Sequence, residues 1–211
     1  MTRAAIAILL ALGACAASAN TRSWDFRVLL DGSEIGEHRY ELREEGESRA
    51  LRSTAQYRVR LLVIDAFRYR HEASERWRGD CLESLASQTE TNGEREAVNA
   101  SLREGRLSVE RQAGGRTSRE EHAGCVMSFA YWNPRMLRAQ RLMNGQTGEV
   151  LPVRIAALGE ESVPVRGRLL RADRHQLTAP GLKIDLWYAN GEWVALEAPA
   201  RGGRVLRYEL R

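Results

Sequence analysis

The sequence has little cysteine, a single lysine and no long apolar run. Its cysteines are Cys15, Cys81 and Cys125, and none of them forms a C-x-x-C pair, which argues against a dithiol redox function. The apolar run at residues 4–12 is far shorter than the roughly 20 residues that a membrane-spanning helix requires, and no later run is longer. We therefore expect no transmembrane span.

The charge is nearly balanced, which argues against a nucleic-acid partner. The chain carries 32 basic and 28 acidic residues, a formal net charge of +4, and Lys183 is its only lysine. Arginines alternate with acids, as in Arg43-Glu44-Glu45, whereas a nucleic-acid binder concentrates its basic residues on one face or tail. The pattern is typical of a solvated surface of mixed sign.

The first 19 residues have the order of a secretory signal peptide. Arg3 gives a positive start, residues 4–12 are apolar, and Ala17-Ser18-Ala19 has the small residues of a cleavage site. We expect the signal to end at residue 19 and residues 20–211 to form one β-rich domain in the periplasm. The alternative is a lipoprotein, because Leu12-Gly13-Ala14-Cys15 resembles a lipobox, in which Cys15 would carry the lipid.

Cys81 and Cys125 are the cysteines left for pairing. Two cysteines in an exported domain usually form a disulfide, because the periplasm is kept oxidising. Such a bond would contribute about 4 kcal/mol as an upper figure in the chain-entropy model. The alternative is two separate buried thiols.

Apolar residues recur with a period of two along most of the chain. Trp24, Phe26, Val28 and Leu30 alternate with other residues, and Asp31-Gly32 then gives a hairpin signal. Strands at this spacing, with glycine-bearing turns such as Asn190-Gly191, predict an antiparallel meander. Because about twelve twisted strands do not stay flat, we expect a curved sheet or partly closed barrel.

One segment breaks the alternation and is the best candidate for a site. Residues 125–134 are apolar and aromatic, and the spacing after Pro134 predicts a short helix near 134–143 that covers one end of the sheet. Aromatic side chains with polar tips suit a ligand cavity. The candidate ligand-binding residues are Phe129, Tyr131, Trp132 and Asn133. The simpler interpretation is that they form a hydrophobic plug.

No motif for catalysis, a metal or a cofactor emerges. The histidines, His38, His71, His122 and His175, lack metal-ligand spacing, so we predict no metal and no cofactor. His71 shares a face with Tyr69 and Trp77, and a structural role is favoured over one in a pocket. No G-x-S-x-G occurs, and the acids in strand-like surroundings are Asp65, Glu75 and Glu83.

Several blocks give the chain a resemblance to a family of uncharacterised exported bacterial β-rich proteins. These blocks are residues 125–134, 142–149 (LMNGQTGE), 186–188 (LWY) and 191–197 (GEWVALE), with support from Trp24-x-Phe26, residues 30–36 and Glu75-x-Trp77. The resemblance implies an exported β domain and brings no activity and no site residues. The pattern is also broadly similar to exported curved-sheet proteins, some of which shelter acyl chains, an analogy of fold alone.

These observations lead to one expectation and two alternatives. We expect a non-enzymatic periplasmic binding protein whose curved sheet shelters an apolar small molecule or lipid. The first alternative is an interaction or scaffold lipoprotein of the envelope, anchored at Cys15. The second is an enzyme of unrecognised type, which a buried carboxylate or histidine with a perturbed pKa would favour.

Overall fold

A computed structural model describes residues 20–61 and 64–211, without the side chains of 60–65; the expected signal peptide and Cys15 lie outside the described residues. The described chain is almost entirely β-strand. The strands are β1 (Asn20–Leu30), β2 (Ser33–Glu45), β3 (Ser48–Leu61), β4 (Ile64–Arg78), β5 (Cys81–Thr91), β6 (Glu94–Arg103), β7 (Arg106–Ala113), β8 (Arg116–Ala123), β9 (Arg141–Met143), β10 (Val150–Pro152), β11 (Arg154–Val165), β12 (Arg168–Ala179), β13 (Leu182–Ala189), β14 (Glu192–Pro199) and β15 (Val205–Leu210). Two short 3-10 helices, η1 (Pro134–Arg138) and η2 (Arg201–Gly203), interrupt them.

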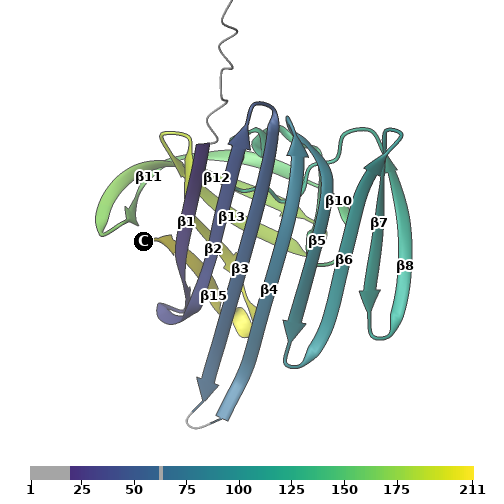
Figure 1. Cartoon of the computed structure of the whole chain (residues 1–211). Helices are drawn as coiled ribbons and strands as arrows, with labels where there is room; N and C mark the ends of the chain where they lie inside the picture. The colour runs from purple at the N-terminus through teal and green to yellow at the C-terminus, as the bar shows by residue number, and fades with distance from the viewer. Residues whose placement is uncertain (1–19, 62–63) are drawn as a thin grey trace, which may run out of the picture.

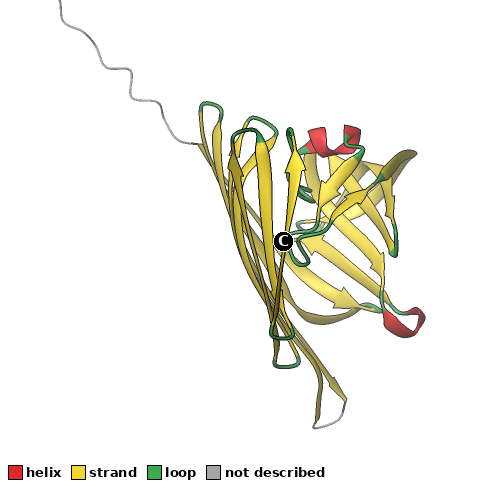
Figure 2. Ribbon diagram, turned by 90° about the vertical axis from the view of Figure 1, so that its right-hand side faces the viewer, coloured by secondary structure: helices red, strands yellow, loops and turns green. Residues whose placement is uncertain are grey.

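Thirteen strands form one antiparallel sheet in the order β11-β12-β13-β14-β15-β1-β2-β3-β4-β5-β6-β7-β8. The pairing of β15 with β1 joins the last third of the chain to the first, with Val28 opposite Tyr208. The sheet curls so that β11–β15 cross over the face of the longer strands (Figures 1 and 2). Its edges, β11 and β8, do not pair with each other, so the sheet is curved but not closed. This confirms the expectation of a curved sheet or partly closed barrel.

Local sequence explains the strands and their turns. In β3, Leu51, Ser53 and Ala55 are buried while the residues between them are exposed, the alternation of a strand with one solvated face. Asp31 and Gly32 both have positive φ, 50° and 80°, as a two-residue type I′ turn requires. We call the face that carries Trp24 and Phe26 the inner face, and the opposite one the outer face.

Residues 124–153 leave the sheet and pack against its inner face. A disulfide joins Cys125 to Cys81, with 5.0 Å between the two Cα atoms. The Leu82 N–H donates to the Val126 carbonyl at 2.9 Å, and the Ser87 hydroxyl donates to the Gly145 carbonyl. The segment therefore fills the space between the two halves of the sheet at the level of these contacts.

The helix expected near 134–143 is shorter than the sequence predicted. Asn133 caps it and Pro134 begins it, but it is a single 3-10 turn that ends at Arg138. Residues 141–143 instead form β9, which pairs with β10, and Leu142 and Met143 are fully buried. The strand pairing satisfies backbone groups that a longer helix would otherwise have satisfied, so tertiary packing overrides the helical spacing.

The core is rich in aromatic rings where the two halves of the sheet meet. The rings of Phe26 and Trp193 lie 4.3 Å apart, and Trp193 also contacts Tyr40 at 5.3 Å and Tyr131 at 5.2 Å. Trp24, Trp77 and Trp193 are among the largest fully buried side chains. Burying such rings favours the joining of the two halves of the sheet.

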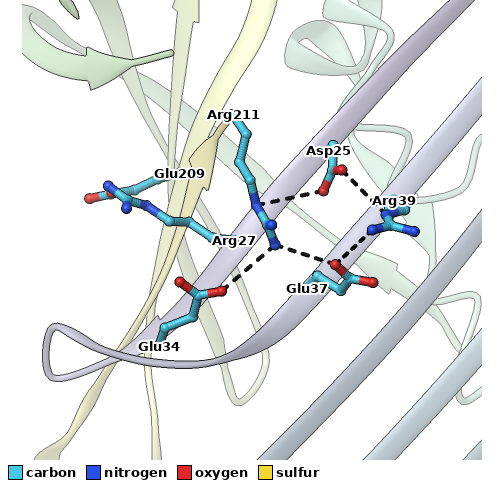
Figure 3. A network of polar contacts seen from close by, with 7 residues as sticks. All are labelled: Asp25, Arg27, Glu34, Glu37, Arg39, Glu209 and Arg211. Carbon is cyan, nitrogen blue, oxygen red and sulfur yellow. Dashed lines mark hydrogen bonds and ion pairs between the residues drawn. The ribbon is translucent and has the colours of Figure 1, made fainter. Parts of the chain in front are cut away.

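On the outer face, a network of charges spans the seam between β15, β1 and β2 (Figure 3). Arg211 lies at its centre, 3.3 Å from Glu37, 3.8 Å from Glu34 and 3.8 Å from Asp25. Its backbone N–H also donates to the Asp25 carbonyl at 2.9 Å. The other pairs in the network are Arg39 with Asp25 and Glu37, and Arg27 with Glu209. The pairs of Arg211 and Arg39 are solvent-exposed, so each is worth little by itself.

Candidate functional site

The four site residues predicted from the sequence divide into two pairs in the structure. Trp132 and Asn133 are buried beside the disulfide. The Trp132 ring meets Trp77 edge to face at 5.6 Å, and the Asn133 amide donates to Asp80 at 3.1 Å while its oxygen caps η1. This pair has the contacts of a structural plug.

Tyr131 lies next to Trp193 and interacts with Tyr208 and Tyr188 on the sheet, and Phe129 contacts Tyr131. Both are half-buried, their rings lie 6.2 Å apart, and the backbone carbonyl of Tyr131 accepts a hydrogen bond from the Tyr188 hydroxyl at 2.8 Å. Burial, followed by the nearby Tyr208 and Tyr188, raises the pKa of Tyr131. This pair borders the polar group described next.

Three tyrosine hydroxyls converge on one imidazole nitrogen. The Tyr40 hydroxyl lies 3.1 Å from Nδ1 of His38, and the Tyr57 and Tyr208 hydroxyls each lie 3.3 Å from it. Tyr57 and Tyr208 also hydrogen-bond to each other. We call His38, Tyr40, Tyr57 and Tyr208 the hydroxyl cluster. Its members come from β2, β3 and β15.

Gly36 explains how Tyr57 and Tyr208 meet across the sheet. In register, Tyr208 lies opposite Val28, Val28 opposite Gly36, and Gly36 opposite Tyr57. Since Gly36 has no side chain, the two rings can lean towards each other over β1 and β2. A Cβ at Gly36 would stand 1.9 Å from the Gln56 carbonyl oxygen, so the close approach of β2 and β3 at this point also requires glycine.

The hydroxyl cluster is electrically neutral at physiological pH. Burial is the main cause that holds the pKa of His38 well below its usual range, with a smaller contribution from His71. Burial raises the pKa of Tyr208 to about 12 and raises those of Tyr40 and Tyr57 well above 10. The phenols therefore keep their protons and can donate hydrogen bonds.

Aromatic rings connect the hydroxyl cluster to one end of the sheet. The Tyr57 ring stacks on Tyr69 with 4.9 Å between centroids and 6° between planes, and Tyr69 is followed along β4 by Phe67 at 6.4 Å and His71 at 6.4 Å. His71 is buried and its Nδ1 lies 2.9 Å from the Thr89 hydroxyl. These contacts agree with the structural role that the sequence favours for His71.

Glu75 is the most perturbed carboxyl group on the inner face. Burial raises its pKa to about 7, although hydrogen bonds from the Trp77 indole at 2.8 Å and the Ser128 hydroxyl at 3.3 Å oppose the rise. Within the described part of the chain, no basic side chain forms an ion pair with it. Nor do the described residues bring three or more His, Cys, Asp or Glu side chains together as a metal site.

Open grooves lie over the outer face and have a different character. One of about 730 Å³ crosses β4–β8, and another of about 440 Å³ lies between β2 and β4, next to Arg211. Their linings mix arginines with glutamates, for example Arg70, Glu72 and Arg95 in the first. Among the described residues, no helix has the length and apolar character needed to cross a bilayer.

Sequence analysis named His38 without a role, and it missed the hydroxyl cluster. Tyr40 could have been found from the sequence, because it lies two residues after His38 in β2 and therefore points to the same face of the sheet. The contribution of Tyr208 was not readable, because it depends on the pairing of the first strand with the last.

The fold and this inner face define the class: an antiparallel, β-barrel-like protein with a tyrosine-rich interior. The model of DUF6134, a domain of unknown function, matches residues 26–211, so the chain belongs to that family. This confirms the resemblance to a β-rich family of unknown function. No curated protein matches the chain. Among solved structures, it is similar to a beta-barrel-like protein of domain of unknown function DUF1849 from Brucella abortus, with a TM-score of 0.67 and 11% sequence identity over 90% of this chain and 94% of that one.

Proposed function

We propose that the protein is a non-enzymatic, periplasmic binding protein that shelters an apolar or lipid-like ligand against its inner face. The observation that carries the proposal is an extension of the β3–β4 hairpin. Pairing of β2 with β3 ends at Gly36 and Tyr57, and pairing of β4 with β5 begins at Tyr69 and Thr91. Residues 58–61 and 64–68 therefore form a two-stranded ribbon that projects past its neighbours (Figure 1).

Two apolar side chains, Val59 and Phe67, lie on the inner face where this ribbon leaves the sheet, and they continue into the aromatic rings of the sheet. Val59 and Phe67 lie opposite each other in register and stay half-buried, whereas the outward-facing Arg58 and Arg68 are exposed. Next to Val59 and Phe67 on the same face are Tyr57 and Tyr69, also half-buried. Apolar side chains in this position gain free energy when a ligand removes them from water.

The packed segment 124–153 limits where a ligand can lie. Its contacts with Leu82 and Ser87 fill the inner face beside the disulfide, so the proposed site is confined to the end that carries the ribbon. Tyr131, from the same segment, interacts electrostatically with Tyr40 and Tyr208, whereas Trp132 contacts Trp77 and Asn133 contacts Asp80.

Binding of a neutral hydrophobic fluorophore tests the proposal. N-phenyl-1-naphthylamine is titrated into the mature chain, residues 20–211, and its fluorescence is followed. We expect saturable binding that Phe67→Ser weakens roughly tenfold, because apolar contact is lost. Leu169→Ser serves as the matched control, since Leu169 is 74% exposed on β12, away from the ribbon. Absence of saturable binding to the wild-type chain would contradict the proposed function.

A further inference from the structure

The hydroxyl cluster has more hydrogen-bonding capacity than its own members can use. A neutral imidazole nitrogen offers either one lone pair or one proton, yet three phenol groups lie within 3.3 Å of Nδ1 of His38. The other ring nitrogen, Nε2, is buried and has no hydrogen-bond partner among the described residues. His38 itself is only 7% exposed. Buried polar groups left in this state are costly, and an added polar group would satisfy them.

The cluster lies at the inner end of the apolar surface described above. Tyr57 belongs to both, because its hydroxyl contacts Tyr208 while its ring stacks on Tyr69. From the ribbon inwards, the sequence of groups is Val59 and Phe67, then the stacked rings of Tyr57 and Tyr69, then the hydroxyls around His38. An amphiphile lying along this surface would bring its polar end to the cluster.

The surroundings of the cluster select against a charged head group. Within the described chain, none of the contacts of His38, Tyr40, Tyr57 or Tyr208 is with an arginine or lysine. Glu75 acts on Tyr40 from the same face and gains negative charge as the pH rises through about 7. An ionised carboxylate or phosphate buried there would lack a cation and would be strongly disfavoured.

We propose that the hydroxyl cluster is the head-group site for a single-chain amphiphile with an uncharged, hydrogen-bonding head, such as the glycerol ester of a monoacylglycerol. The inference rests on the proposed function, because the acyl chain lies against Val59, Phe67 and the rings of Tyr57 and Tyr69. The phenols donate to the ester carbonyl, and both the phenols and His38 can accept from head-group hydroxyls.

Two ligands with the same twelve-carbon chain are compared by their displacement of N-phenyl-1-naphthylamine. The comparison tests the head-group assignment separately from the proposed function. Glycerol monolaurate is uncharged, and laurate is ionised at pH 8; both are used below their micelle concentrations. We expect the wild-type chain to prefer glycerol monolaurate by about tenfold, the effect of roughly one net hydrogen bond. Tyr57→Phe and Tyr208→Phe, which remove one oxygen each, should reduce that preference to less than about threefold.

Tyr188→Phe is the matched control, because its hydroxyl bonds to the Tyr131 carbonyl and not to His38; it should keep the preference. Thermal melts establish that each variant folds, and Tyr40→Phe replaces any variant that does not. If the fluorophore binds but both ligands displace it equally, or the Phe variants keep the preference, the head-group assignment is wrong and the proposed function stands. If the fluorophore does not bind, both are wrong.

Discussion

The hydroxyls of Tyr57 and Tyr208 hydrogen-bond to each other although 151 residues separate them in the sequence. The contact crosses β1 and β2, and the residue opposite Tyr57 on β2 is Gly36, which has no side chain to lie between the rings. Glycine at this position thus both brings β2 close to β3 and leaves room for the two rings. The same contact ties the last strand to the hydroxyl cluster.

Gly36→Ala should destabilise the protein by about 3 kcal/mol, because the new methyl group would overpack against backbone that cannot move freely. The clash is with the Gln56 carbonyl oxygen at 1.9 Å. Gly32→Ala is the control, since a Cβ there meets nothing within 4 Å and its positive φ should cost only about 1 kcal/mol. Urea unfolding measures both. Equal losses for the two variants would contradict the close approach of β2 and β3.

Loss of the disulfide should lower the free energy of unfolding by up to about 4 kcal/mol, because the closed loop of 44 residues restricts the unfolded chain. Urea unfolding of the wild-type protein with and without reductant measures the effect. The double variant Cys81→Ala/Cys125→Ala should be as unstable as the reduced wild type and insensitive to reductant. An oxidised wild type no more stable than this variant would show that the bond contributes nothing.

Glu75 should make the protein less stable as the pH rises from about 5 to about 8. Its pKa in the folded state is raised to about 7 from the ordinary 4.5, so between these values the unfolded chain has released a proton that the folded chain retains. Since the unfolded state then binds fewer protons, stability falls with rising pH. The loss attributable to Glu75 is about 3 kcal/mol at most.

Glu75→Gln should abolish that part of the pH dependence, which chemical denaturation at several pH values measures. Glu121→Gln, on the exposed edge strand β8, is the control and should retain the wild-type profile. If the Glu75→Gln and wild-type profiles run parallel from pH 5 to pH 8, the carboxyl group does not carry the perturbed pKa.

Arg211→Ala should cost less than about 1 kcal/mol, because exposed ion pairs gain little over their hydration. The side chain is 42% exposed and reaches three acids at 3.3–3.8 Å (Figure 3). The difference from wild type should shrink further in 0.5 M salt, which screens charges at this distance. A loss of several kcal/mol that persists in salt would mean that the network, and not the core, holds β15 to β1.

Local patterns in the sequence predict most of the strands but not the way they meet. The alternation of Trp24 and Phe26 with other residues predicts that one face of the strand is buried. Asn190-Gly191 predicts a turn, which the positive φ values of both residues confirm. Pairing of β1 with β15, in contrast, depends on burying Phe26 against Trp193, a contact between distant segments that no local pattern encodes. Antiparallel neighbours along the chain are therefore easier to predict than the closure of the sheet.

The candidate site shows the same limit. An aromatic cluster next to a cysteine pointed to residues 129–133, and in the structure Tyr131 interacts with Tyr208 and Tyr188 while Phe129 contacts Tyr131. Trp132 instead packs on Trp77, because the chain turns at residues 131–132 and sends the two neighbouring rings to different partners. The helix expected to 143 ends at Arg138, since Leu142 and Met143 find strand partners.

Native mass spectrometry of the protein purified from its native host, compared with the same sample after denaturation, tests most directly whether the inner face shelters a ligand. The account predicts an added mass in the native spectrum that matches an uncharged amphiphile, is lost on denaturation and is diminished in Phe67→Ser but not in Leu169→Ser. A native spectrum that shows only the bare chain, from a protein that also fails to bind N-phenyl-1-naphthylamine, would contradict it.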